Sequence, residues 1–461
     1  MAQHITELSR SENSTRLMTR LLRSGTGSCR RTAIRALTVA VAVAGLSPVA
    51  AAWAKDPAGT VSTPVTTAHG AGTTSLGSGP VIAVDHRQRP VVATTSGPRL
   101  ALLRYTKKGR LDKTFSGDGI ARLKVKKNLA VSDIAFDYRG RIVVVGASNA
   151  SSGERARLIV LRLTKKGKPD KGFGRRGVVT VDHASGTAVT IEPSGRLVVS
   201  GRSTMPSAAL VARLDGAGRL DPGFGDHGVA RLSVYGAQEG PYVGTGAGET
   251  VIDAAGRVVV ELRVFRGIGQ PSETGVARFT SGGALDTSFG DVGGYTSDTL
   301  GLPVTGALSR GLAARPHGGY TVSGATHGQF FLQRYDADGL PDGAPLLTDV
   351  TSGFLEGGDA MAVDAAGRVV SVGQSYPRLT VLRYASEDGL DAGFASNGVY
   401  RAKKLKGTRS AGATDVAIDA RGRIWVAGVA TAKGSRSDRV VITRLKQNGR
   451  PDRKWRTRGR H

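Results

Sequence analysis

Basic side chains are the most abundant groups in this sequence that could bind a ligand. The 461 residues include 64 Lys and Arg against 37 Asp and Glu, a formal net charge of +27. The excess lies toward the two ends: residues 55–175 hold 23 basic and 8 acidic residues, residues 401–461 hold 18 and 4, and residues 176–400 hold 16 and 23. Such a field attracts polyanions.

The candidate polyanion-binding residues are basic residues in the variable segments between repeated turns. They are Lys124, Lys126, Lys127, Arg155, Arg157, Lys403, Lys404, Lys406, Arg409, Lys433, Arg436 and Arg439. Few aromatic residues stand among them, which argues against stacking on single-stranded bases. We therefore expect an anionic cell-wall polymer or surface polysaccharide as partner, with nucleic acid less favoured. The alternative is that the charge only keeps the protein soluble.

Evidence for catalysis is weak. Glu239 and Glu249, with Tyr235 and Tyr242, lie in the longest variable segment and are the nearest equivalent of an enzyme's carboxylate pair. Solvated loop residues are the competing interpretation. The sequence has no Gly-x-Ser-x-Gly elbow and no phosphate-cradling loop. No catalytic residue is assigned.

Metal and thiol chemistry are not expected. The histidines are scattered without metal-ligand spacing. Asp336-Ala-Asp-Gly339 is similar to the start of a calcium loop but lacks the later Glu. The single cysteine, Cys29, precedes an apolar run near the N-terminus and is lost if that region is cleaved. We expect no metal and no cofactor.

The elements that position these residues are short strands in a recurring unit, clearest at residues 132–181. Ser132–Asp137 alternates apolar and polar residues, and Ile142–Val145 is a β-branched run closed by Gly146. Leu158–Leu163 and Gly177–Val181 are predicted as two further strands, separated by a Gly/Pro/Asp turn. The unit is therefore predicted to have four strands.

Two landmarks recur about seven times. One is a turn of the form Asp-x-x-Gly-Arg, as at Asp137–Arg141, predicted as a tight hairpin in which Gly supplies a positive φ. The other is an Arg followed eight residues later by an Asp. The pairs are Arg104/Asp112, Arg162/Asp170, Arg213/Asp221, Arg278/Asp286, Arg334/Asp342, Arg383/Asp391 and Arg444/Asp452. A structural role for this pair is favoured over a sevenfold ligand ring.

Seven four-strand units predict an all-β fold, a seven-bladed β-propeller of four-stranded blades. The last unit ends near Trp455, where its fourth strand should begin, and Thr60–Thr66 is a strand-like segment before the first unit. We expect this N-terminal strand to complete the last blade and close the ring. Pro64 suits an edge strand, where no ladder donor is needed.

The repeated turn resembles the signature of the delta-60 repeat family. The resemblance rests on Gly218-Arg-Leu-Asp-Pro-Gly-Phe-Gly-Asp-His-Gly228, on similar turns at 109–115 and 284–290, and on Arg141-Ile-Val-Val-Val-Gly146. It covers roughly residues 80–457 and implies a propeller of unsettled function, with no catalytic residue to carry over. The fifth copy departs from the pattern: Pro345 stands where the Phe belongs, which predicts a looser blade. The sixth has Ala395 after the Phe and the seventh has Trp455.

The N-terminal region is predicted to be a secretory signal peptide, residues 1–54. Arg30, Arg31 and Arg35 precede the apolar run Ala36–Leu46, and small residues lead to cleavage after Ala54. A membrane anchor is the alternative, but the run is shorter than the roughly 20 residues of a spanning helix. Met18 is a second candidate start, and the export route, general secretory or twin-arginine, is left open.

The expected organisation is a signal peptide at 1–54, a closing strand and linker at 55–79, and the propeller at 80–457. Both repeated turns should lie on one face and the variable connections on the other, which rigid scaffolds often use for binding. We expect a secreted or cell-wall-associated monomer with no transmembrane segment in the mature chain, acting as a non-catalytic binding or scaffold protein. The alternative is a propeller hydrolase or lyase acting on a glycan or peptide.

Overall fold

The protein is represented by a computed structural model that describes most of the chain after residue 60. The described residues are 61–67, 79–96, 99–124, 129–148, 156–234, 243–267, 270–300, 308–326, 328–351, 356–385, 389–403, 405, 408–433 and 438–455.

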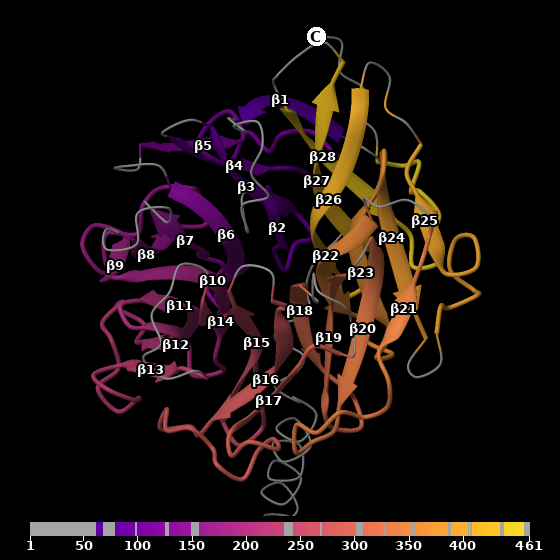
Figure 1. Cartoon of the computed structure of the whole chain (residues 1–461). Coiled ribbons are helices and arrows are strands. Elements are labelled where there is room, and N and C mark those ends of the chain that lie inside the picture. The colour runs from indigo at the N-terminus through magenta and orange to yellow at the C-terminus, as the bar shows by residue number, and fades with distance from the viewer. Residues whose placement is uncertain are drawn as a thin grey trace, which may run out of the picture. The chain divides into compact units, whose positions relative to one another are not determined.

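The described part of the chain forms seven four-stranded antiparallel sheets. The sheets stand as blades around a common axis, and the chain passes from one blade to the next around the ring (Figure 1). No helix occurs within the described residues. The predicted all-β seven-bladed propeller is confirmed.

The first three blades follow each other directly in sequence. Blade one contains β2 (Val81–Val84), β3 (Pro90–Ser96), β4 (Arg99–Arg104) and β5 (Ile120–Lys124). Blade two contains β6 (Leu129–Phe136), β7 (Ile142–Ser148), β8 (Arg157–Leu163) and β9 (Val178–Asp182). Blade three contains β10 (Ala184–Ile191), β11 (Leu197–Thr204), β12 (Ser207–Leu214) and β13 (Val229–Leu232).

Blades four to six repeat the same order, and blade seven takes its outer strand from the N-terminal end. Blade four contains β14 (Val243–Ile252), β15 (Val258–Arg266), β16 (Glu273–Phe279) and β17 (Tyr295–Asp298). Blade five contains β18 (Leu308–Ala314), β19 (Tyr320–Thr326), β20 (Gln329–Tyr335) and β21 (Leu346–Thr348). Blade six contains β22 (Glu356–Val363), β23 (Val369–Ser375), β24 (Arg378–Tyr384) and β25 (Val399–Arg401). Blade seven contains β26 (Thr408–Ile418), β27 (Ile424–Ala432), β28 (Asp438–Leu445) and β1 (Val61–Thr67).

The hydrophobic core lies between the blades. The described residues form seven buried hydrophobic clusters, and each cluster combines residues of two adjacent blades. The cluster around Trp425 and Trp455 joins blade seven to blade one. The second strand of a blade, such as β7, is buried along its whole length because neighbouring blades cover both of its faces. This explains the continuous β-branched runs in the sequence.

A glycine lies within the second strand of most blades for a steric reason. The innermost strand carries a register shift, for example between Val131 and Asp133 in β6. That bulge brings the carbonyl oxygen of Ala130 to 2.1 Å from where a Cβ on Gly146 would stand. The same approach occurs at Gly201, Gly324, Gly373 and Gly428. A side chain at these positions would clash with backbone, so only glycine fits.

The two ends of the described chain meet in blade seven. β1 pairs antiparallel with β28, with Val61 opposite Ile442, and the register shifts between Thr63 and Thr67. In Figure 1 the indigo β1 lies beside the yellow β28. Blade seven also contacts blade one, where Ile82 N donates to Asp415 Oδ2 at 2.6 Å. No helix long and apolar enough to cross a membrane was found in the described ranges.

Candidate functional site

Strand order separates two kinds of connection. Turns between the first and second strands and between the third and fourth strands lie on one face, called here the turn face. The remaining connections lie on the opposite face, the connection face. In blade one, for example, Arg99 at the start of β4 stands opposite Lys124 at the end of β5, so both mark the connection face.

The Asp-x-x-Gly-Arg turns are held by their own side chains. Asp137 Oδ1 accepts from the backbone N of Arg139 and of Arg141, at 3.0 and 2.9 Å, and Oδ2 accepts from Arg141 Nε at 2.6 Å. Gly140 has a φ of 72°. The predicted tight turn with Gly at positive φ is therefore present, and the Asp satisfies its amides.

The Arg–Asp pairs form structural contacts within and between blades. Arg162 Nε donates to Asp170 Oδ2 at 2.8 Å, while its Nη1 reaches the carbonyl of Gly216 in blade three at 2.7 Å. The guanidinium lies 4.2 Å from the centre of the buried Phe173 ring. Equivalent Arg–ring contacts occur in blades one, three, four, six and seven. This arrangement agrees with the structural role expected from the sequence.

The two repeated turns of a blade are also linked, which the sequence did not indicate. Arg141 of the first turn donates from Nη1 to Asp170 of the second at 3.2 Å. Burial raises the pKa of Asp170, but hydrogen bonds from Gly172 and Arg162 and the charges of Arg162 and Arg141 outweigh it, so the pKa is lowered. The aspartate is therefore a structural anion rather than a proton donor.

Six of the twelve predicted polyanion-binding residues lie outside the described residues. These are Lys126, Lys127, Arg155, Lys404, Lys406 and Arg436. The other six are exposed at strand ends on the connection face: Lys124, Arg157, Lys403, Arg409, Lys433 and Arg439. They belong to blades one, two and seven or to the segment joining blades six and seven, so they lie in the sector where the ends of the sequence meet.

Within the described residues, Arg157 is the one member of these six that forms an ion pair. Its Nε lies 2.6 Å from Asp182 Oδ1, across the β8–β9 register. Both side chains are exposed, so this ion pair contributes little to stability. It does, however, cancel the local charge of Arg157.

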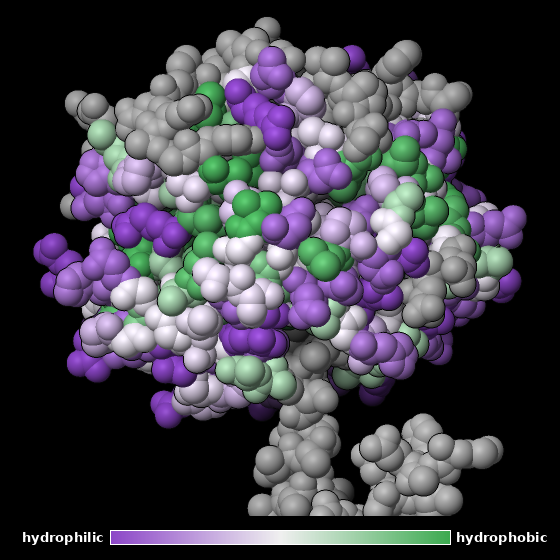
Figure 2. Space-filling view, turned by 60° about the horizontal axis from the view of Figure 1, so that its bottom comes forward, coloured by the Kyte–Doolittle hydropathy of each residue, from purple (hydrophilic) through white to green (hydrophobic). Residues whose placement is uncertain are grey.

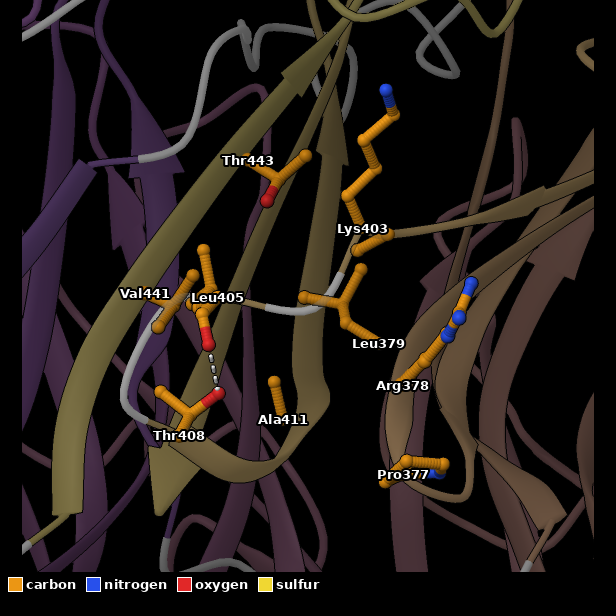
Figure 3. Close-up of a pocket in the computed structure, with 10 residues that line it drawn as sticks. Pro377, Arg378, Leu379, Lys403, Leu405, Thr408, Ala411, Val441 and Thr443 are labelled. Carbon is orange, nitrogen blue, oxygen red and sulfur yellow. Dashed lines mark hydrogen bonds between the residues drawn. The ribbon is translucent and has the colours of Figure 1, made fainter. Parts of the chain in front are cut away.

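Lys403 borders a small hollow between blades six and seven. The hollow holds about 10 Å³ and is lined by residues such as Leu379, Leu405 and Thr443. That is room for a single water molecule. In Figure 3, Lys403 and Arg378 both run upward, away from Pro377 and Ala411. The hollow is too small for an organic ligand, while its two cations remain available to a surface ligand.

The turn face of blades seven, one and two carries a denser set of basic residues, which the sequence analysis missed. We call this set the turn arc. All its members are exposed: Arg87, Lys107, Lys108, Arg110, Lys113, Arg139, Lys165, Lys166, Lys168, Lys171, Arg175, Arg176, Arg421, Lys446, Arg450, Arg453 and Lys454.

No turn-arc side chain forms an ion pair among the described residues. The exposed ion pair between Arg122 and Asp118 lies nearby but includes no turn-arc residue. The signal was present in Lys107-Lys108-Gly109-Arg110 and Lys165-Lys166-Gly167-Lys168. The corresponding turn of blade five, Asp336–Gly339, has no basic residue. The recurring residues of this turn are its Gly and Asp, whereas the charge lies at the positions beside them.

Contacts between blades fix neighbouring turns of the arc to each other. Ser116 N of blade one donates to the carbonyl of Lys166 in blade two at 3.1 Å. Arg104 Nη1 reaches the carbonyl of Lys165 at 2.5 Å. Gly109 of blade one packs on the ring of Trp455 of blade seven. The three basic turns therefore form one continuous and rigid surface.

A second charged cluster lies on the inner strands of blades four to six. Glu261 is fully buried; its Oε1 accepts from Arg263 Nε at 2.7 Å and its Oε2 from Glu249 N at 3.2 Å. Arg310 Nη1 lies 3.6 Å from Asp359 Oδ1. Burial raises the pKa of Asp359 despite the opposing charge of Arg310.

This cluster corrects the predicted loop carboxylates. Glu249 lies in β14 and not in a loop. Tyr235, Glu239 and Tyr242 lie outside the described residues. Within the described part of the chain, no group of three or more His, Cys, Asp or Glu residues could hold a metal ion.

Hydrophobic side chains do not form a large surface patch on the side seen in Figure 2, where small hydrophobic groups are separated by hydrophilic residues. Exposed large apolar residues such as Tyr138, Val292 and Leu347 come from different blades. Scattered apolar residues of this kind are normal for a protein surface.

Comparison with known proteins supports the repeat assignment. Residues 264–289 match a family described as a domain of unknown function (DUF5122) beta-propeller. This match confirms, for one repeat, the resemblance drawn from the repeated turn. No curated protein matches the sequence.

Solved structures of several propellers resemble the chain. Virginiamycin B lyase from Staphylococcus aureus is 10% identical to this chain, with a TM-score of 0.47; the matched region covers 84% of this chain and 99% of the lyase. Polysaccharide lyase Uly1 is 10% identical over 83% of this chain and 92% of its own, with a TM-score of 0.46. Regucalcin from Agrobacterium tumefaciens is 14% identical, with a TM-score of 0.39; the matched region covers 71% of this chain and 93% of regucalcin.

Proposed function

We propose that the protein is a non-catalytic binding or scaffold protein that holds a polyanion on the basic sector formed by blades seven, one and two. The observation that carries the proposal is the turn arc, a continuous surface of exposed cations with no ion-pair partner among the described residues. Cations that are not neutralised by neighbouring acids create the field that a polyanion requires.

The rigidity of the turns supports this function. The loops that carry Lys108 and Lys166 are fixed by hydrogen bonds to adjacent blades, so binding orders only the side chains. Less conformational entropy is then lost than with mobile loops. The connection-face residues Lys124, Lys403, Arg409, Lys433 and Arg439 extend the same sector on its other face.

The expected ligand is an anionic wall polymer or surface polysaccharide. The predicted signal peptide would place the protein outside the cytoplasm, in the medium or in association with the wall. Tyr138 is the one exposed aromatic residue of the described turn-face segments of these three blades. Base stacking, which single-stranded nucleic acids favour, therefore has little support.

The test is retention of residues 55–461 on immobilised polyanions and purified cell-wall material, at low and at physiological salt. Two matched charge-reversal variants separate the faces: K107E/K108E/K165E/K166E on the turn arc, and K124E/K403E/R409E/K433E on the connection face. Each changes the net charge by the same amount. We expect retention that weakens with salt, because salt screens exposed charges, and that is lost mainly in the turn-arc variant.

The remaining outcomes are equally informative. Loss confined to the second variant would move the site to the connection face. Equal, partial loss in both would show that bulk charge alone is sensed and would contradict a defined site. No retention at either salt would overturn the binding function.

An enzymatic role is the second candidate, a hydrolase or lyase acting on a glycan or peptide. The raised pKa of Asp359, caused by burial, is the property of a general acid. Arg310, whose Nη1 lies 3.6 Å from Asp359 Oδ1, supplies a cation beside this carboxyl group. Turnover of a glycan or peptide substrate that is abolished by D359N would favour this role over binding.

A further inference from the structure

Six blades share an inter-blade socket filled by their own aromatic residue. The ring from one blade lies under the glycine of the next blade's turn: a Cβ on Gly167 would stand 2.7 Å from Phe115, and one on Gly339 would stand 2.3 Å from Phe289. An Arg guanidinium caps each Phe at 4.2 to 4.6 Å from the ring centre. The sockets thus bind a benzyl group between a glycine turn and a cation.

Blade five has the socket without the ring. Pro345 stands where the other blades have the aromatic residue, and the turn glycine that should cover it is Gly389 of blade six. A Cβ on Gly389 would meet no described atom within 4 Å. A cavity of about 470 Å³ occupies this place and is lined by Pro345, Gly389 and Arg334 among others. Its volume lies within the roughly 300–1,000 Å³ of ligand pockets.

The lining has an apolar and a cationic side. Leu332, Leu346, Val369 and Tyr384 contribute apolar surface. Tyr384 is fully buried, and its hydroxyl bonds to Thr348 at 3.0 Å, so its ring forms a fixed wall.

Basic residues reach the same cavity from the first turn of blade five and from its third strand, β20. Arg315, Arg334 and His317 belong to the lining. Arg315 occupies the first position of the turn, where the other blades have Asp or, in blade three, Glu192, and it pairs with Asp342. The cavity therefore presents guanidinium groups beside a space shaped for an aromatic ring.

We propose that this cavity is a binding site for a small aromatic carboxylate. The ring takes the place of the missing Phe, between Tyr384 and the turn at Gly389, with the Arg334 guanidinium against its face as in the sister sockets. The carboxylate lies at the rim, toward Arg315, where a planar guanidinium can bind it. This inference is independent of polyanion binding, because the cavity lies between blades five and six.

The first experiment titrates residues 55–461 with 3-phenylpropionate by calorimetry. We expect saturable binding with a Kd at or below about 1 mM. Pro345→Phe supplies the ring from the chain itself and should abolish binding while keeping or raising the melting temperature. The matched control is Leu347→Phe, which adds the same ring two residues away on an exposed strand position outside the lining and should bind normally.

A second comparison tests the carboxylate without relying on that variant. The amide 3-phenylpropionamide should bind about tenfold more weakly than the acid, since it cannot form charge-assisted hydrogen bonds. Arg315→Gln should remove this difference. Absence of binding to the unsubstituted protein, binding that survives in a folded Pro345→Phe protein, or equal affinity for acid and amide would each overturn the proposal.

Discussion

At the residue scale, the aspartate of each second turn combines several stabilising contacts. For Asp112, burial raises the pKa, but hydrogen bonds from Thr114 and the charges of Arg104 and Arg89 lower it further than burial raises it. For Asp286, the hydrogen bond from Ser288 is the largest cause of a lowered pKa. The pKa values of Asp221, Asp391 and Asp452 are also lowered. Asp419 of a first turn is an exception, because burial raises its pKa.

These shifts predict how stability depends on pH. In six of the second turns the folded pKa of the aspartate lies below its unfolded value, so the folded state favours the ionised form; the six are Asp112, Asp170, Asp221, Asp286, Asp391 and Asp452. The contribution of each is therefore complete above the unfolded pKa of about 4 and is lost as the pH falls through the folded pKa. We expect the melting temperature to be level near neutral pH and to fall below about pH 4.

Replacement of one such residue checks the cause. Asp286→Asn should lower the melting temperature at pH 7 and reduce the difference between pH 7 and pH 3, measured by circular dichroism. An unchanged difference would show that these carboxylates do not cause the loss of stability at low pH. Asp226→Asn, at an exposed position, is the control.

At the element scale, β1 is unusual because the strand it pairs with lies far away in the sequence. Its partner β28 lies more than 370 residues away, with Val61 opposite Ile442. Pro64 falls within the irregular part of the register, between Thr63 and Thr67, where its missing N–H interrupts no regular ladder. The pairing joins the two ends of the chain in one blade.

Removal of β1 is predicted to destabilise the whole propeller. Deleting residues 55–68 removes β1, so the edge of β28 is exposed and the β1–β28 backbone pairing is lost. We expect a markedly lower melting temperature by differential scanning calorimetry. Deleting only residues 55–60, which precede the strand, should leave it unchanged. Equal melting of the two truncated proteins would show that the strand does not hold the ring closed.

At the scale of the whole molecule, ring closure determines where the charge gathers. Contacts between blades seven and one, such as Ile82 with Asp415 and Thr414 with Pro80, make the two basic ends of the sequence neighbours. The acidic middle of the sequence forms the other blades. A single basic sector is therefore a consequence of circular topology.

The N-terminal region supplies the remaining prediction. If residues 1–54 are a cleaved signal peptide, the exported protein should begin at Lys55 and lack Cys29. N-terminal sequencing and intact-mass measurement of protein recovered from the culture medium or the wall fraction would establish this. Ala54→Pro, which blocks the cleavage position, should give a longer product. A retained Met1 or Met18 in the exported protein would contradict cleavage.

Local features were predictable because they depend on near neighbours in the chain. Alternation of apolar residues, Gly and Asp in tight turns and the repeat length together predicted four-strand blades and their number. The same reasoning assigned Lys403, Arg409 and Lys433 to the variable connections, on the face opposite the repeated turns. The role of Gly146 was not predictable, since the carbonyl that excludes a side chain there belongs to a bulge in the neighbouring strand.

The sequence by itself determined the blades, their turns and the net charge, because propensity, periodicity and charge are properties of short segments. Only the tertiary structure decided which segments share a surface. Lys108 and Lys166 lie 58 positions apart, yet their turns are joined by inter-blade contacts. Pro345 signalled a departure from the repeat, but the cavity it leaves exists only because Gly389 of the next blade closes over the empty place. Such adjacency arises from packing between blades, which local sequence does not encode.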